Sequence, residues 1–270
     1  MSLELDDRQR AMLAEMGVRT WAPLGAETEA VASAALPDTT PAPARPSVAP
    51  PAATSTAGAS PRVVVPAPVV ARTAPLARLP RPEGIASMDW PALREAVAGC
   101  QACGLCEGRR NTVFGTGDER ADWLIVGEAP GENEDLQGEP FVGQAGKLLD
   151  NMLKALGLDR QDKVFIANVL KCRPPGNRNP DPAEVAQCQP FLQRQVELLQ
   201  PRIILAMGRF AVQSLLQTTE PIGRLRGRAH QYQGVPLVVT YHPAYLLRNL
   251  PDKAKAWADL CLASELLRGA

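Results

Sequence analysis

Residues 123–135, WLIVGEAPGENED, join a short run of large apolar side chains to a loop of glycine, proline and carboxylates. Residues 123–126 have the length and the unbroken apolar character of a strand that is buried on both faces, and Gly127 ends it. Similar short runs follow at residues 164–170, 202–206 and 236–240. Longer helical patterns separate them, so the sequence predicts an α/β fold with a central, mostly parallel four-stranded sheet flanked by helices.

Helical patterns fill the intervals around these strands, at residues 143–156, 182–199, 210–216 and 252–267. The first has leucine and methionine at helical spacing and ends at Gly157. Pro190 interrupts the second, which predicts a kink or a break there. Upstream, Asp89 is positioned to cap a further helix whose first turn contains Pro91.

Polar residues follow the predicted strands. Glu128, Asn168, Gly208 and His242 each lie near the carboxyl end of one of them. In open α/β sheets ligands bind beyond the carboxyl ends of the strands, so we expect a functional site at this edge. His242 is one of only two histidines and begins the segment HPAYLLR, residues 242–248. This segment offers one polar catalytic group, apolar side chains that can act as a wedge, and a cation for a phosphate.

Composition divides the chain into three parts. Of the 26 prolines, 12 fall between Pro37 and Pro82, among small residues that bury little surface. Residues 25–86 are therefore predicted to be a disordered linker. It would join a short helical peptide at residues 1–24 to a folded domain at residues 87–270.

Charge and hydropathy restrict the class of protein. Lys and Arg together number 29, as do Asp and Glu, so a nucleic-acid partner would have to bind a local basic patch. No apolar run reaches membrane-spanning length, and the acidic start, MSLELDD, lacks the basic and apolar regions of a signal peptide. These features predict a soluble, cytoplasmic protein with no membrane partner.

Four of the six cysteines form two pairs with the spacing of metal ligands. Cys100 and Cys103 form a CxxC motif, and fifteen residues separate Cys172 from Cys188. Four thiolates suit either a tetrahedral zinc ion or a [4Fe–4S] cluster, and the spacing does not decide between them. The alternative is that the first pair consists of two unrelated core thiols.

The other two cysteines have different expectations. Cys106 is a spare that would be able to replace a ligand of the first pair, whereas Cys261 lies on the apolar side of a helix and is expected to be an inert core thiol. Basic residues flank both cysteine pairs and form either a solvated surface or a platform for phosphates. They are Arg109, Arg110, Lys171, Arg173 and Arg178, which Arg224, Arg226 and Arg228 would extend.

Four segments together resemble the family 4 uracil-DNA glycosylases, which are iron–sulfur enzymes that remove uracil from DNA. The segments are residues 127–135, 138–149, 168–175 and 242–248. The resemblance covers about residues 90–268 and implies a uracil-DNA glycosylase-like fold that acts on single- and double-stranded DNA containing uracil. It also implies a [4Fe–4S] cluster on Cys100, Cys103, Cys172 and Cys188.

The resemblance implies a role for each polar residue of the site. Excision requires that the base is flipped out of the stack into a pocket. Phe141 would stack on the uracil ring, and the Asn168 amide would read N3–H and O4 together. His242 would donate to O2 as negative charge builds on the leaving base. Glu128 would orient water or stabilise the sugar cation.

Further residues would complete the pocket and hold the DNA. The backbone N–H groups of Ala129 and Gly131 would line the pocket, and Glu134 would exclude the methyl group of thymine. Tyr245, Leu246 and Leu247 would fill the gap left in the DNA helix, and Arg248 would bind phosphate. Because no lysine is placed as a Schiff-base nucleophile, we expect a monofunctional glycosylase. The alternative class is a non-catalytic DNA-binding module with a structural metal.

The N-terminal segment has a separate resemblance. Residues 8–24, RQRAMLAEMGVRTWAPL, contain a short amphipathic helical pattern that ends at Gly17, followed by Trp21. The segment is similar to the peptide by which the psi subunit of the replicative polymerase docks on the clamp loader. A replisome partner is therefore one expectation, and a helix that packs on its own domain is the alternative.

Overall fold

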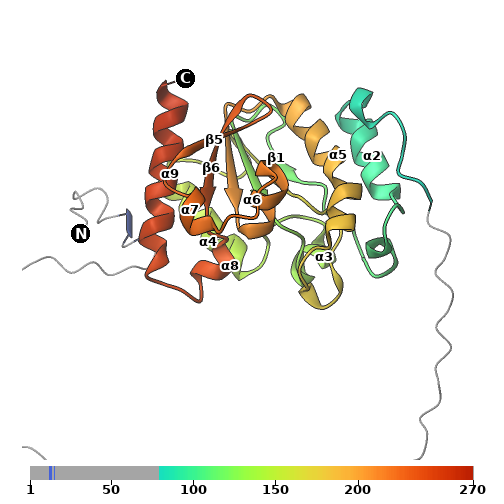
Figure 1. The fold of residues 1–270 in the computed structure, drawn as a ribbon, viewed down its shortest axis with the longest axis horizontal. Helices are drawn as coiled ribbons and strands as arrows, with labels where there is room; N and C mark the ends of the chain where they lie inside the picture. Colours follow the sequence, from blue (N-terminus) through green and yellow to red (C-terminus); the bar gives the residue numbers. More distant parts are fainter. Residues whose placement is uncertain (1–11, 14, 16–78, 270) are drawn as a thin grey trace, which may run out of the picture. The chain divides into compact units, whose positions relative to one another are not determined.

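The structure is a computed structural model that describes residues 12, 13, 15 and 79–269 (Figure 1). Most of the predicted peptide at residues 1–24 and of the predicted linker at residues 25–86 lies outside the described residues. In the continuous part, the first buried side chain is that of Ile85, in the short 3-10 helix η1 (Ile85–Ser87), which packs into the core.

Six strands form one sheet in this part of the chain, in the order β1-β3-β2-β4-β6-β5 (Figure 1). The four inner strands are parallel to one another, which confirms the predicted α/β fold and its parallel strands. They are β2 (Trp123–Gly127), β3 (Val164–Asn168), β4 (Ile203–Met207) and β6 (Val235–Thr240).

Two antiparallel strands, β1 (Thr116–Gly117) and β5 (Ala229–Tyr232), extend the sheet at its edges. The expected number of four strands is therefore too low for the whole sheet. The sequence does not predict the edge strands, because β1 has two residues and β5, with the sequence AHQY, lacks an apolar run.

Helices cover both faces of the sheet, because alternate residues of each strand point to opposite sides. Leu124 and Val126 of β2 share one apolar core with α2 (Trp90–Gly99), α5 (Pro182–Leu199) and α6 (Arg209–Leu216). Trp123 and Ile125 share the other core with α4 (Gln144–Ala155), α8 (Pro243–Leu246) and α9 (Asp252–Gly269). Shorter helices lie in the connections: η2 (Gly104–Glu107), α3 (Glu132–Gln137), η3 (Pro175–Asn177) and α7 (Ile222–Leu225).

Two local expectations about helices have different outcomes. Asp89 caps α2 as predicted, since its Oδ1 accepts a hydrogen bond from the Ala92 N–H at 3.0 Å. Helix α5 runs through Pro190 without the predicted break. Proline has no N–H to bond the carbonyl four residues earlier. That carbonyl, of Ala186, instead accepts a long hydrogen bond of 3.5 Å from the Arg81 guanidinium.

The register of the sheet brings the carboxyl ends of its strands to one level. Gly127 pairs with Asn168 on the neighbouring strand, and Met207 pairs with Thr240. The loops that follow these residues therefore meet at one edge of the sheet. Among the described residues, no helix has both the length and the apolar character that crossing a bilayer requires.

Candidate active site

A cavity of about 790 Å³ opens where the loops after the parallel strands meet. Its walls also include the segment of η3 and the start of α7, which lie far apart in the sequence. Nine of the residues predicted for the site line it: Glu128, Ala129, Gly131, Glu134, Phe141, Asn168, His242, Tyr245 and Arg248. The cavity lies at the edge of the sheet where the sequence predicts a ligand site.

Asn168, the last residue of β3, presents an unused acceptor to this cavity. The residue is 2 % exposed, and its Oδ1 has no hydrogen-bond partner among the described residues. Its backbone is held firmly, because it pairs with Gly127 and its carbonyl accepts a hydrogen bond of 2.9 Å from Lys171 Nζ. A buried acceptor without a donor costs about 1–3 kcal/mol, which a ligand N–H would recover.

The Phe141 ring lies beside Asn168 because two glycines make room for it. A Cβ atom on Gly127 would overlap Asn168 Oδ1 and lie 2.7 Å from Phe141 Cζ, and one on Gly146 of α4 would overlap the Phe141 carbonyl. Phe141 itself has φ of 54°, a conformation that side chains with a Cβ rarely adopt. Arg160 donates to its carbonyl at 3.1 Å. The surrounding structure thus holds Phe141 in a strained position, as is common at binding sites.

His242 is the N-cap residue of α8, and its ring stacks on Phe141 with 5.3 Å between centroids. Its Nδ1 accepts a hydrogen bond of 3.1 Å from the Ala244 N–H, so this nitrogen is unprotonated. The pKa of the ring falls to about 4, chiefly because the ring is buried; Glu134 opposes this shift, and Arg248 contributes to it. His242 is therefore neutral at physiological pH, and its proton lies on Nε2, as an N–H donor.

Glu128 follows β2 and is bound at the start of α6. Its Oε1 accepts a hydrogen bond of 3.0 Å from the Phe210 N–H. Burial raises the pKa of this carboxyl group, while the Phe210 N–H and the Arg209 charge oppose the rise. Gly208, with φ of 95°, leaves space for the carboxylate where a Cβ atom would clash with it. Glu128 is thus a carboxylate held in one orientation at a helix N-terminus.

Glu134 organises the loop in front of the cavity. Its two carboxylate oxygens accept hydrogen bonds from the N–H groups of Gly131 at 3.0 Å, Val142 at 3.1 Å and Gly143 at 3.4 Å. Gly131 lines the cavity, and its N–H donates to Glu134. Ala129 remains at the cavity wall, partly buried against the core.

The segment after β6 divides its apolar side chains between the core and the surface. Leu246 is 0 % exposed and belongs to the core on the α9 side, so the prediction that it inserts into DNA is wrong. Leu247 is 42 % exposed. Tyr245 donates its hydroxyl to Asp252 Oδ2 at 2.7 Å, and Arg248 is exposed at the cavity wall. In α8, helical geometry turns one of two adjacent leucines inward and leaves the other outside.

The four predicted cysteine ligands lie on the α5 side of the sheet and are mostly buried. Cys103, Cys172 and Cys188 belong to that core, and Cys100 packs against it. Burial raises the pKa of the Cys172 thiol to about 11, an effect that Arg109 opposes. Arg109 donates to Cys172 Sγ at 3.1 Å, and the Lys171 N–H donates to Cys188 Sγ at 3.4 Å.

The two remaining cysteines lie in different parts of the fold. Cys106 lies in η2 near Cys103, whereas Cys261 packs in the core on the opposite face of the sheet. Within residues 79–269, no three Cys, His, Asp or Glu side chains are arranged to hold a single metal ion. The structure brings the four cysteines to one region of the fold.

Lys171 has a function that its sequence context does not predict. It was grouped with the basic residues that would bind phosphate, but its side chain is buried. Its Nζ donates to the carbonyls of Asn168 at 2.9 Å and Phe114 at 3.2 Å, and to Gln195 Oε1 at 2.6 Å. The available signal is its place directly after an apolar run and directly before Cys172. Lys171 links the end of β3 to the cysteine region.

Comparisons with known proteins agree with this geometry. A family model described as the uracil DNA glycosylase superfamily matches residues 114–261. The type-4 uracil-DNA glycosylase of Saccharolobus solfataricus is 45 % identical over 184 residues, which are 65 % of this chain and 85 % of that protein. The type-4 enzyme of Archaeoglobus fulgidus is 45 % identical over 159 residues, 56 % of this chain and 79 % of that protein. The type-4 enzyme of Sulfurisphaera tokodaii is 45 % identical over 166 residues, 58 % of this chain and 75 % of that protein.

The chain belongs to the type-4 uracil-DNA glycosylases. This confirms the family that the four motifs predict. The segment matched to the uracil-DNA glycosylase superfamily contains all the predicted cavity residues from Glu128 to Arg248, and also Cys172 and Cys188. Cys100 and Cys103 precede it.

The neutral state of His242 leads to a prediction about pH. The folded pKa lies below the ordinary value of 6.5, so the ring stays neutral through that pH and gains a proton only as pH falls towards 4. Nitrogen-15 NMR of histidine-labelled protein should show one ring with unprotonated Nδ1 and protonated Nε2 at pH 7 that persists at pH 5.

The same labelling contains its own control. The chain has two histidines, so His242→Gln leaves only the signals of His230 and assigns the other set. Protonation of the His242 ring near pH 6.5 would contradict the assignment of a neutral donor.

Proposed function

We propose that this chain is a monofunctional uracil-DNA glycosylase, which flips uracil out of DNA and hydrolyses its N-glycosidic bond as the first step of base excision repair. The observation that carries the proposal is the unpaired Asn168 Oδ1 in a cavity that Phe141 and His242 also line. A flipped base is flat and carries polar groups along one edge, which matches a stacking ring and an amide.

Asn168 supplies the recognition of uracil. Its Oδ1 accepts the N3–H of the base, and its Nδ2 donates to O4. Cytosine has an acceptor at N3 and a donor amino group in place of O4, so both contacts become repulsive. Buried polar groups that are left unpaired discriminate strongly between such bases. The links from Asn168 to Gly127 and Lys171 keep the amide in position during this choice.

His242 and Glu128 act on the bond that breaks. The Nε2–H of His242 donates to O2 as the uracil leaves with negative charge, and the ring is already in the tautomer that this requires. The Glu128 carboxylate, oriented by the Phe210 N–H, positions water or stabilises the sugar cation. Both groups are held by backbone N–H groups, so little reorganisation accompanies the reaction.

Glu134 and Ala129 complete the base pocket. Three backbone N–H groups hold the Glu134 carboxylate, so it cannot swing aside for a larger base. This rigidity supports a role for Glu134 in excluding the methyl group of thymine. Ala129 also lines the cavity, and its short side chain takes up little of the space.

Residues after β6 contact the DNA itself. Leu247 is the exposed apolar side chain that replaces the flipped base, Tyr245 lines the cavity, and Arg248 binds a phosphate. In the described part of the chain, no lysine lines the cavity. This supports hydrolysis by water, without a Schiff base and without cleavage of the strand. The alternative is a DNA-binding module without catalysis. It would not explain why backbone N–H groups hold Glu128 and His242 at the cavity.

An excision assay tests the proposal. The protein is incubated with labelled single-stranded and duplex oligonucleotides that contain one uracil, and part of each sample is then treated with alkali. We expect cleavage of both substrates only after alkali, because a monofunctional glycosylase leaves an abasic site. Asn168→Asp should reduce the preference for uracil over cytosine, since a carboxylate cannot donate to O4.

The control is Asn151→Asp, an exposed position on α4 with the same chemical change. It should retain wild-type rate and selectivity. Absence of alkali-dependent cleavage would contradict the enzyme, and unchanged selectivity in Asn168→Asp would contradict the role of the amide.

For the cysteine region, we propose a [4Fe–4S] cluster held by Cys100, Cys103, Cys172 and Cys188. The chemistry of the donor set fits, because four soft thiolates in one mostly buried region suit iron–sulfur clusters. The cluster would cross-link the segment before η2 to β3 and α5, and Arg109 and Lys171 would offset its charge.

Iron analysis tests this assignment. Cys188→Ser should lose bound iron and soluble protein together, because metal binding and folding are coupled. Cys261→Ser is the matched control on the opposite face of the sheet and should retain its iron and its visible absorption. Equal iron loss in both variants would mean that the assignment of the ligands is wrong.

We also propose that residues 8–24 dock on a replisome component, with the clamp loader as the first candidate. The support is the sequence, in which a helical pattern precedes an aromatic anchor, Trp21, within a short motif. Leu13, the buried residue of this segment that the structure describes, is 1 % exposed and belongs to the core that α4 and α9 share. Docking would therefore compete with packing on the chain's own domain.

Removal of residues 1–78 separates these roles. We expect the excision rate on oligonucleotides to stay within about twofold and binding to the purified clamp loader to be lost; Trp21→Ala should have the same effect. Binding that survives both changes would contradict docking through this segment. Loss of excision would mean that the segment is part of the catalytic domain.

A further inference from the structure

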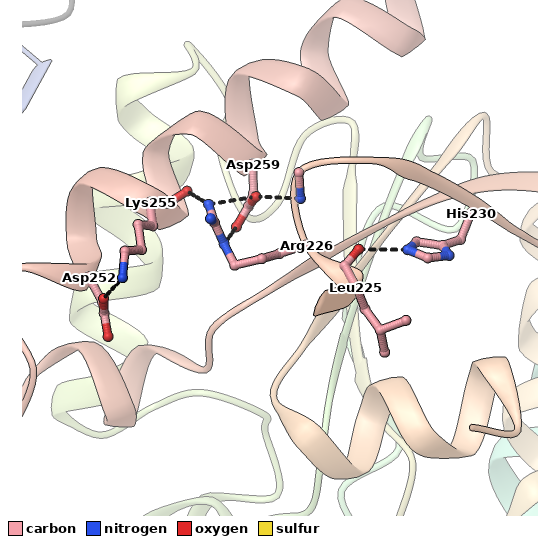
Figure 2. Close-up of polar contacts among 7 residues, drawn as sticks. Leu225, Arg226, His230, Asp252, Lys255 and Asp259 are labelled. Atoms are coloured by element: carbon pink, nitrogen blue, oxygen red, sulfur yellow. Dashed lines mark hydrogen bonds and ion pairs between the residues drawn. The ribbon is translucent and has the colours of Figure 1, made fainter. Parts of the chain in front are cut away.

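The loop between α7 and β5 is fastened to α9 by a buried ion pair (Figure 2). Asp259 on α9 is 0 % exposed. Its carboxylate accepts hydrogen bonds from Arg226 Nε at 3.0 Å, from Arg226 Nη2 at 2.9 Å and from the Gly227 N–H at 3.2 Å. Arg226 Nη2 also donates to the Lys255 carbonyl. On the other side of the loop, His230 Nε2 donates to the Leu225 carbonyl at 2.7 Å.

This arrangement changes the role of Arg226. The sequence places it with Arg224 and Arg228 in a patch for phosphates, but only those two neighbours are exposed. The charge of Arg226 is matched by a fully buried carboxylate, and the fork of its guanidinium is occupied by that carboxylate. Its planar group is therefore fixed in position and is not available to the DNA backbone.

The fixed guanidinium lies against the segment that enters DNA. Arg226 Cζ is 5.7 Å from the centroid of the Tyr241 ring, within the range of a cation–π contact. The Tyr241 ring stacks on Tyr245 with 5.0 Å between centroids. The Tyr245 hydroxyl donates to Asp252, which also forms an ion pair of 2.8 Å with Lys255. The first turns of α9 thus hold the stacked tyrosines at both ends.

The segment held in this way contains the groups that the proposed reaction uses. Residues 241–248 carry His242 at the N-cap of α8 and the exposed Leu247 one residue past its end. A side chain that replaces a base inside duplex DNA must enter a narrow space in one orientation. If the segment moved freely, ordering it would reduce the free energy available for insertion.

We propose that Arg226 and Asp259 are positioning residues that hold the Tyr241–Tyr245 stack, so that Leu247 inserts into duplex DNA while His242 meets the flipped base. The inference rests on the proposed glycosylase function. It requires that the pair matters more for duplex DNA than for single strands. In a single strand, no partner base and no continuous stack must be replaced.

The test compares single-turnover excision of uracil from duplex and single-stranded oligonucleotides. For Arg226→Lys, which keeps the charge but loses the planar fork, we expect a rate on duplex about ten- to a hundredfold below wild type. The rate on single strands should stay within about threefold of wild type. Arg94→Lys, the same chemical change at an exposed arginine of α2 that pairs with Glu119, is the control and should keep the wild-type ratio of the two rates.

Because a change at the buried pair can also impair folding, Asp252→Ala provides a second variant. It removes the partner of the Tyr245 hydroxyl, and the charge of Lys255 that it leaves behind is exposed. We expect the same selective loss on duplex DNA. Equal losses on both substrates, in Arg226→Lys and in Asp252→Ala, would overturn the proposal.

Salt dependence separates positioning from a direct phosphate contact. Loss of one phosphate contact would lower the slope of log K against log salt for duplex binding by about 0.9. For Arg226→Gln, which removes the positive charge, we expect a slope equal to that of wild type, and a lower slope would overturn the proposal. Failure of the proposed function has a different signature, since the wild-type protein would then release no uracil from either substrate.

Discussion

The close approach at Gly127 is the constraint on which the rest of the site depends. The parallel register places Gly127 beside Asn168, and the absence of a side chain allows the Phe141 ring to lie within van der Waals distance of the same backbone. Any Cβ atom there would overlap the Asn168 amide. Gly146 does the same for the Phe141 backbone from the side of α4. Two missing side chains thus create the contact between the stacking ring and the amide.

Backbone N–H groups orient the polar side chains around this contact. The Phe210 N–H binds Glu128, the Ala244 N–H binds the His242 ring, and three N–H groups bind Glu134. Such donors belong to helix starts and tight loops, which the sheet register holds in place. The site is therefore ordered before a base enters, and burial moves the pKa of His242 towards its neutral form.

The two faces of the sheet carry different tasks in the proposed mechanism. On the α5 side, the four cysteines lie next to Lys171, which binds the carbonyl of Asn168. On the α9 side, Arg226 and Asp259 lie next to the segment that contains His242 and Leu247. Each face supports one end of the cavity, base recognition on one side and DNA insertion on the other. Lys171 and Arg226 are both basic side chains that bind partners within the protein, Gln195 and Asp259.

Sequence patterns alone were sufficient for the α/β fold, the parallel strands, the family and the residues around the cavity. These follow from short apolar runs, helical spacing and motifs that are local in the chain. Such local patterns can be recognised without knowing how the side chains pack. Residues that depend on burial were not predictable in this way. Leu246 and Leu247 are identical and adjacent, and only the packing of α8 on the core decides which one faces solvent.

Lys171 and Arg226 follow the same rule. The sequence offers both cations to DNA phosphates, and each donates instead to a partner within the protein. For Lys171 and Arg226 that partner lies 24 and 33 residues away in the chain. The sequence determines which groups can form hydrogen bonds. The tertiary structure decides which of them are already paired, because pairing requires atoms distant in the chain to lie within about 3 Å of each other.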